Sequence, residues 1–170
     1  MRKLIATIIA LLVAALASGF ILLEARGEGP PQPIEFDHWQ HISKEEGPQL
    51  ECAACHEYAD QSPNATIPSV YTCMVCHESI NAESPEIKKL AAFSQRAEEP
   101  PWQRVYWIDP KADVFFSHKS HTRARIDCAD CHGQVSQSRR IKREINQSMG
   151  WCIDCHKQKQ ASTDCYICHR

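Results

Sequence analysis

Cys52-Ala53-Ala54-Cys55-His56 is the first of five short motifs in which two cysteines stand three positions apart and a histidine follows directly. The chain has 170 residues and ten cysteines, and every cysteine belongs to one of these motifs. The other copies are Cys73-Met74-Val75-Cys76-His77, Cys128-Ala129-Asp130-Cys131-His132, Cys152-Ile153-Asp154-Cys155-His156 and Cys165-Tyr166-Ile167-Cys168-His169. One chemistry therefore has to account for all ten cysteines.

The spacing predicts covalent attachment of haem. Two thiols three positions apart can form thioethers with the two vinyl-derived carbons of one haem, while the next residue places its imidazole on the iron. Disulfides and zinc sites are the alternatives, since both also use cysteine pairs at short spacing, but neither requires a histidine directly after the second cysteine. We therefore expect five c-type haems, with the proximal iron ligands His56, His77, His132, His156 and His169.

Four histidines remain, and they occur as two HxxH pairs, each behind a phenylalanine. The stretch 36–41 reads FDHWQH and precedes two of the motifs, and the stretch 115–121 reads FFSHKSH and precedes three. A lone histidine is more often a surface or core residue than a ligand. Two identically spaced pairs favour the sixth iron position instead, so the expected distal ligands are His38, His41, His118 and His121.

Five haems and four distal histidines leave one iron short, and methionine is the other common sixth ligand in cytochromes. Of the three methionines, Met1 lies at the extreme N-terminus and Met74 sits inside a motif. Met149, just before Cys152, is the remaining candidate. Its alternative role is a core methionine packed against a haem face.

The N-terminal residues predict export. Arg2 and Lys3 precede an uncharged apolar stretch over residues 4–23, which is long enough to span a bilayer. The sequence 15–17, Ala-Leu-Ala, also resembles a signal-peptide cleavage site. A single uncleaved anchor at residues 1–25 is the favoured interpretation, and by the positive-inside rule it leaves the cysteine-rich part outside the bacterial inner membrane, in the periplasm.

The remainder divides into modules. A Gly- and Pro-rich linker covers residues 26–34, a two-haem module covers 35–83, a connecting helix and loop cover 84–110, and a three-haem module covers 111–170. Ser84 and Pro85 predict the start of the connecting helix, which Pro100 and Pro101 would stop. Sustained strand or helix periodicity is otherwise lacking, so the expected fold is mostly irregular with short α-helices around a haem core.

Charge differs between the two halves of the chain. Residues 24–109 carry 15 acidic and 6 basic side chains, whereas residues 110–170 carry 6 acidic and 11 basic ones. Arg139, Arg140, Lys142 and Arg143 form the densest basic cluster, which would dock or steer an acidic partner, balance haem propionates, or face solvent. The net charge of −2 does not suggest nucleic-acid binding, and no phosphate loop, nucleophile triad or paired-carboxylate site is visible.

The HxxH leads followed by haem motifs resemble class III cytochromes of the c3 and c7 type. A closer similarity runs from about Phe36 to His156 through the stretches 67–69, 72–74, 84–85, 101–105 and 148–152. Together these resemble the pentahaem subunit of alternative complex III, with the related quinone reductase complex cytochrome next. Residues 107–113 and the short tail after Lys157 depart from that pattern.

The resemblance implies a haem-cored class III-like domain behind one transmembrane helix, acting as an electron carrier and not as an enzyme. Its partners would be iron-sulfur or molybdopterin-like and quinol-binding membrane subunits, with a periplasmic electron acceptor. It also implies a pairing of distal and proximal ligands: His38 with His56, His41 with His77, His118 with His132, His121 with His156, and Met149 with His169. Swaps between the two HxxH pairs are the alternative.

Two other functions are compatible with the motifs. A stand-alone membrane-anchored cytochrome would feed electrons to soluble reductases. A haem reductase would bind its substrate at an open iron, which requires that Met149 not be a ligand.

Overall fold

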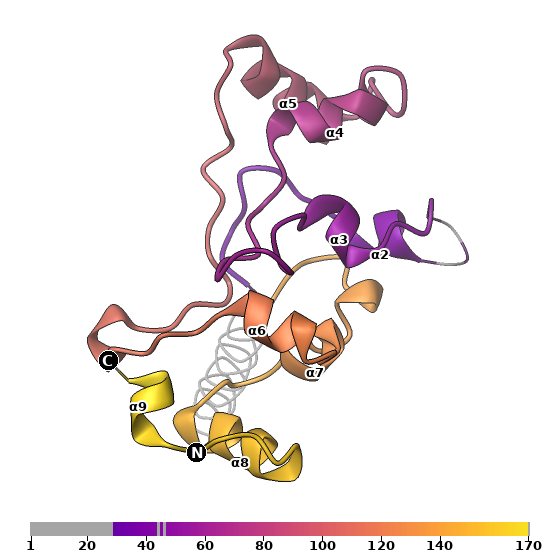
Figure 1. Ribbon diagram of the computed structural model, residues 1–170. Coiled ribbons are helices and arrows are strands. Elements are labelled where there is room, and N and C mark those ends of the chain that lie inside the picture. Colours follow the sequence, from indigo (N-terminus) through magenta and orange to yellow (C-terminus); the bar gives the residue numbers. More distant parts are fainter. Residues whose placement is uncertain (1–28, 44, 46, 170) are drawn as a thin grey trace, which may run out of the picture.

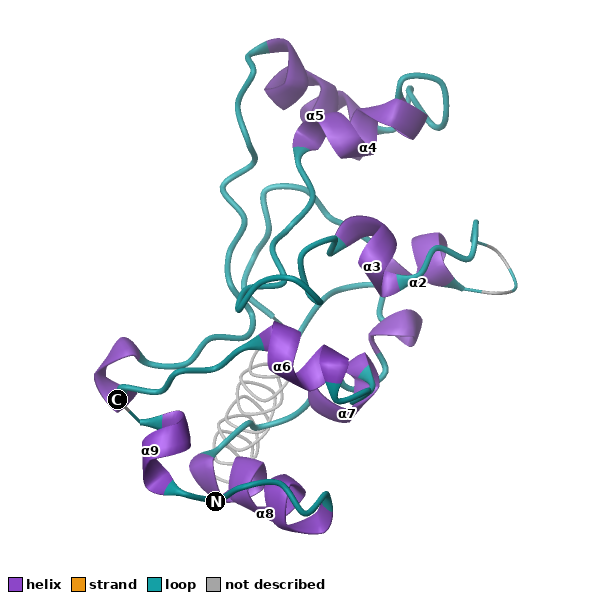
Figure 2. Cartoon of the chain, viewed as in Figure 1, coloured by secondary structure: helices purple, strands orange, loops and turns teal. Residues whose placement is uncertain are grey.

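The computed structural model describes residues 29–43, 45 and 47–169. In this part the chain forms short helices joined by long irregular segments, which confirms the expected mostly irregular, helical fold (Figure 2). The only β pairing among these residues is an isolated bridge between Val114 and His169. The helices are α2 His38–Ile42, α3 Cys52–Cys55, α4 Val70–His77, α5 Pro85–Gln95, η1 Pro110–Ala112, α6 His118–Arg123, α7 Cys128–His132, η2 Val135–Gln137, α8 Met149–Gln158 and α9 Cys165–Cys168.

Each of the five cysteine motifs lies on or at the end of a short helix, and four of these helices have a side-chain cap. Ser69, Asp127, Ser148 and Asp164 precede α4, α7, α8 and α9, and each side chain accepts a hydrogen bond from a backbone N–H of the first turn. Such caps satisfy donors that a helix start leaves without a partner. A helix of four or five residues needs this help, because it is too short to be stable by itself.

The helix predicted after Ser84 is present as α5, with Pro85 as its first residue. The helix runs toward Ala97, as expected, and ends at Gln95, before the two prolines. Ala97 has a left-handed backbone with φ of 53°, and the N–H of Glu98 bonds back to the carbonyl of Phe93 at 3.1 Å. A left-handed residue just past the last turn ends a helix in this way.

The polypeptide supplies a very small hydrophobic core. Among the described residues, the buried apolar side chains are Ile34, Val70 and Leu90, and Met74, Phe93 and Trp102 are among the partly buried side chains packed against them. This cluster holds α4 against α5 and lies at one end of the molecule. Large apolar side chains are exposed elsewhere, up to 85% for Tyr166. A domain of this size normally buries far more apolar surface. The small core therefore leaves space between the helices for apolar groups that are not side chains, such as the expected haems.

The helices follow one another in space in an order that differs from the sequence. Figure 1 shows α4 and α5 at one end, α2, α3, α6 and α7 in the middle, and α8 and α9 at the other end. Thus α3 lies between α4 and the C-terminal helices, although it precedes α4 in the chain.

In the part of the chain that the structure describes, no helix is both long and apolar enough to cross a membrane. The predicted anchor at residues 1–25 lies outside that part.

Candidate functional site: five motifs and two histidine pairs

The two cysteines and the histidine of each motif can act together because of helical spacing. Positions i, i+3 and i+4 lie on one face of an α-helix, so in the second, third and fourth motifs, whose histidine lies within the helix, both sulfur atoms and the imidazole project to the same side. His56 and His169 directly follow the last residue of their helices. All ten cysteines lie in the described residues and are free thiols, each partly or fully exposed. The thiols are therefore available for thioether formation.

Most of the histidines are fixed by the same hydrogen bond. In seven of the nine, Nδ1 lies 2.6 to 3.0 Å from a backbone carbonyl oxygen, and because a carbonyl can only accept, the Nδ1–H donates. The Nε2 lone pair is then free to bind a metal. This is the usual arrangement of metal-bound histidines, whose second ring nitrogen is held by an acceptor. The seven are His41, His56, His77, His118, His121, His156 and His169.

The two HxxH segments have nearly the same local geometry. Phe36 lies edge-on to His38 at 4.8 Å between ring centroids and stacks on His41 at 4.4 Å. In the second segment Phe116 lies edge-on to its first histidine at 4.9 Å and stacks on the second at 4.7 Å. In each pair the second histidine donates Nδ1–H to the carbonyl four residues earlier. The phenylalanine therefore sets the two rings of each pair in different directions.

Three of these distal histidines face a motif histidine. Centroid separations are 5.9 Å for His41 and His77, 6.3 Å for His118 and His132, and 6.1 Å for His121 and His156. Metal–imidazole bonds are about 2 Å long, so two rings on opposite sides of one metal have centroids roughly 6 Å apart once the ring radii are added. The spacing of the three pairs fits one six-coordinate iron between each.

The fourth pair is His38 with His56. Burial first, and then the neighbouring His56 and His41, lower the pKa of His38 to about 4. The Nδ1 of His38 is buried without a hydrogen-bond partner. Burial also lowers the pKa of His132, with smaller effects from His118 and His56. Both imidazoles are thus held in the neutral form, which is the form that binds a metal.

His169 and Met149 are placed differently from the four histidine pairs. His169 is anchored to η1, because its Nδ1–H donates to the carbonyl of Ala112 at 3.0 Å. Met149 is the first residue of α8, and its side chain is 68% exposed. The structure therefore fixes His169 in the same way as His56, His77 and His156, whereas ligation by Met149 remains a prediction.

The five motifs lie close to one another in a definite order. Burial, followed by a neighbouring cysteine, raises the pKa of several motif thiols: Cys55 acts on Cys73, Cys52 on Cys128, Cys155 on Cys131, and Cys168 on Cys152. Each of these pairs links two different motifs.

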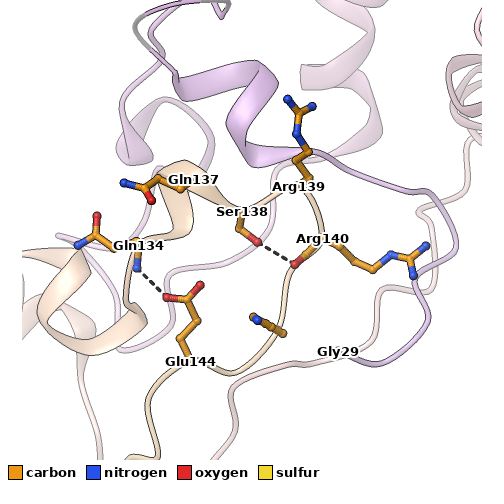
Figure 3. Close-up of a pocket in the computed structure, with 8 residues that line it drawn as sticks. Gly29, Gln134, Gln137, Ser138, Arg139, Arg140 and Glu144 are labelled. Atoms are coloured by element: carbon orange, nitrogen blue, oxygen red, sulfur yellow. Dashed lines mark hydrogen bonds between the residues drawn. The ribbon is translucent and has the colours of Figure 1, made fainter. Parts of the chain in front are cut away.

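The basic cluster makes contacts within the chain. The Arg139 guanidinium lies over the Trp39 ring at 4.0 Å and 3.3 Å from the Asp37 carboxylate, and Arg140 pairs with Glu35 at 2.6 Å. The N–H of Trp39 also donates to the carbonyl of Ser138. Beside these contacts is a cavity of about 450 Å³, lined by Gln134, Gln137, Ser138, Arg139, Arg140 and Lys142 among others (Figure 3). Two of the four basic residues therefore join the N-terminal segment to the C-terminal half.

Sequence reasoning missed the groups that orient the histidines. Tyr106 lies edge-on to His132 at 4.6 Å, donates its hydroxyl to the His132 carbonyl, and accepts from the N–H of Glu144 at 2.8 Å. The carbonyl acceptors of His118 and His169 belong to Pro63 and Ala112, which are 55 and 57 positions away in the chain. Backbone acceptors carry no residue-type signal, so the sequence could not have revealed them.

Comparison with known proteins points to the same chemistry. Residues 114–170, which contain the third, fourth and fifth motifs, match the family described as cytochrome c7 and related cytochrome c. The chain is also similar to the menaquinone reductase, multiheme cytochrome c subunit, of Nitratidesulfovibrio vulgaris strain Hildenborough, with 27% identity over 166 residues that cover 82% of this chain and 77% of that protein. The chain is therefore similar to a multihaem c-type cytochrome over most of its length and to the cytochrome c7 family over residues 114–170, and both similarities imply c-type haem.

Proposed function

We propose that this protein is an electron-relay cytochrome that holds five c-type haems, four between histidine pairs and one between His169 and Met149. The supporting observation is the spacing of about 6 Å between each of three HxxH histidines and a motif histidine. When bound, haem supplies one-electron exchange between ferrous and ferric iron. The protein would contribute the thioether cysteines, the two axial ligands of each iron and, for seven of the nine histidines, a carbonyl acceptor that orients the imidazole.

The protein is a subunit of a quinol-oxidising membrane complex in this proposal. The similarity to a menaquinone reductase cytochrome subunit over most of both chains supports a membrane complex that acts on a quinone. The quinol-oxidising direction rests on the resemblance of the connecting segments to alternative complex III. A single anchor at residues 1–25 would hold the haem domain in the periplasm, where it passes electrons from iron-sulfur and quinol-binding subunits to a periplasmic acceptor. Alternative complex III is the assembly that the connecting segments resemble most.

Haem counting and carbon monoxide binding test the relay function. Protein purified from membranes should contain five haems per polypeptide, and the ferrous form should show no spectral change with carbon monoxide, since no iron has an open position. Fewer than five haems would contradict the cofactor assignment. A carbon monoxide adduct on one haem would favour a reductase instead, with the exposed Met149 not bound to iron.

Purification in mild detergent tests the assembly. A complex subunit should elute with larger membrane partners, and mass spectrometry should find iron-sulfur and quinol-binding proteins among them. Elution as a single polypeptide would instead support the stand-alone cytochrome that feeds soluble reductases.

A further inference from the structure

We infer that the chain holds its haem sites in one unbranched series whose order is second, first, third, fourth, fifth. Sites 1 to 5 are numbered here by their motifs in chain order, from Cys52–His56 to Cys165–His169. The inference rests on the proposed function, because it assumes that every motif holds a haem. It assigns sites 2 and 5 as the two ends, where electrons enter and leave.

Sites 2 and 1 are neighbours through α2. His41 faces the site 2 histidine at 5.9 Å, while His38, one helical turn earlier, lies beside the site 1 histidine. Cys73 of site 2 is also close to Cys55 of site 1. One five-residue helix therefore supplies the distal ligands of both sites.

Sites 1 and 3 are neighbours through α6, which packs on the loop after site 1. The backbone N–H and the Nδ1–H of His118 both donate to the Pro63 carbonyl, at 3.0 and 2.9 Å, and the Thr122 hydroxyl donates to the Ala59 carbonyl at 3.2 Å. The backbone N–H of Lys119, also in α6, donates to the Ser62 carbonyl at 3.1 Å. This junction brings the third motif to the first and not to the second.

Sites 3, 4 and 5 continue in chain order. α6 faces the histidines of sites 3 and 4 with His118 and His121, and the Gln147 amide, just before α8, donates to the carbonyl of Cys131 at 2.7 Å. The helix of site 5, α9, follows α8 after a short connection, and the two helices lie next to one another in Figure 1. Figure 1 shows the same succession from α4 through α3 and α7 to α8 and α9.

The two ends follow from this order. Sites 1, 3 and 4 each have neighbours on two sides, whereas sites 2 and 5 each have one. With haem bound at every site, an electron from a reduced donor would enter at one end of the series and leave to an oxidised acceptor at the other end. Site 2 stands between sites 1 and 3 in the sequence, but in space it lies beyond site 1, at one end of the series.

Redox interactions between haems test the order in the five-haem protein. Oxidation of one iron adds a positive charge, which raises the midpoint potential of a second haem by an amount that falls with distance. Two-dimensional exchange NMR on partly reduced samples follows each haem's methyl signals through the oxidation stages. The interaction between sites 1 and 3 should be at least about twofold larger than that between sites 2 and 3, because site 1 separates the latter pair.

Two matched variants assign the signals. His118→Met places a thioether on the site 3 iron, and His41→Met places one on the site 2 iron, so each shifts the methyl signals of one haem. An interaction between sites 2 and 3 that equals or exceeds that between sites 1 and 3 would overturn the order while leaving a five-haem relay intact. Missing haems or an open iron would instead be seen in the haem count and the carbon monoxide spectrum, and would contradict the proposed function.

Discussion

At the scale of single residues, hydrogen bonds at Nδ1 orient most of the histidine rings. A neutral imidazole whose Nδ1–H is held by a carbonyl presents Nε2 to the metal and is a stronger ligand. His38 and His132 are not among the seven histidines held in this way, and the Nδ1 of His38 is buried without a hydrogen-bond partner. Phe36 and Phe116 each contact both imidazoles of an HxxH pair, one edge-on and one stacked, and so fix the directions of the two rings.

Met149→His should lower the highest of the five midpoint potentials. A thioether favours ferrous iron relative to imidazole, so the haem of His169 should be the highest if Met149 binds it, and the change should be a fraction of the roughly 0.8 V that axial ligands span. A spectroscopic redox titration of both proteins measures the shift. Met149→Leu should open the same iron to carbon monoxide, and Met74→Leu is the matched control without either effect. An unchanged set of midpoints in Met149→His would rule out ligation by Met149.

At the scale of helices, the end of the molecule that contains α4 and α5 differs from the rest. It holds the small apolar core of Ile34, Val70 and Leu90, so side chains and not the cofactor hold its two helices together. Elsewhere the helices depend on caps and on the groups they carry. We therefore expect packing mutations to have their largest effect at this end.

Leu90→Ala should destabilise the α4–α5 pair by about 2 to 4 kcal/mol, because it leaves a cavity where a side chain of 5% exposure was packed. Denaturant unfolding measures the loss of stability. Amide hydrogen exchange in the variant, compared with the parent protein, should become faster in α4 by more than it does in α8. Ile80→Ala, at a side chain of 55% exposure, is the control and should cost much less. Equal costs for the two variants would show that the cluster does not stabilise the fold.

Glu86 ties the segment before α2 to the first turn of α5. Its carboxylate accepts from Lys89 at 2.6 Å and from the N–H of Glu35 at 2.8 Å, and these bonds, the lysine first, lower the pKa of Glu86. A folded-state pKa below the unfolded value means that the ionised form stabilises the protein above pH 4.5 and that the benefit is lost as the pH falls through the lowered pKa.

Glu86→Gln should therefore lower the melting temperature at pH 7, by a cost of about 1 kcal/mol or less for a pair at the surface. The difference from the parent protein should shrink below pH 4.5 and vanish at more acidic pH. Thermal unfolding at several pH values checks this. Glu83→Gln, which removes an exposed partner of Lys88, is the control. A difference that stays constant with pH would contradict the role of the Glu86 charge.

At the scale of the whole molecule, contacts between distant segments align the two halves. Arg139 stacks on Trp39 and pairs with Asp37, about a hundred positions away in the chain. The basic cluster, in which the sequence suggested a docking site for an acidic partner, thus contributes at least two arginines to contacts within the chain.

Arg139→Gln should destabilise the protein by about 1 to 2 kcal/mol through loss of the stacked cation and the ion pair. Arg139→Lys keeps the charge but not the planar stacking, so it should have an intermediate cost. Denaturant unfolding at low and high salt compares them, with Arg96→Gln as the control because Arg96 pairs only with nearby residues on the α5 side. A lysine variant as unstable as the glutamine variant would show that stacking, and not charge, carries the contact.

The sequence by itself determined the chemistry of this protein. The CxxCH spacing and the two HxxH pairs are local signals, because helical geometry alone puts i, i+3 and i+4 on one side, and the helix at Ser84 and Pro85 was likewise predictable from its first residues. Tertiary structure decided which distal histidine faces which motif, which carbonyls hold His118 and His169, and how the motifs follow one another. The carbonyl contacts of His118 and His169 join residues more than fifty positions apart in the chain. Irregular loops bring such residues together, and no sequence pattern predicts which backbone carbonyl will be the acceptor.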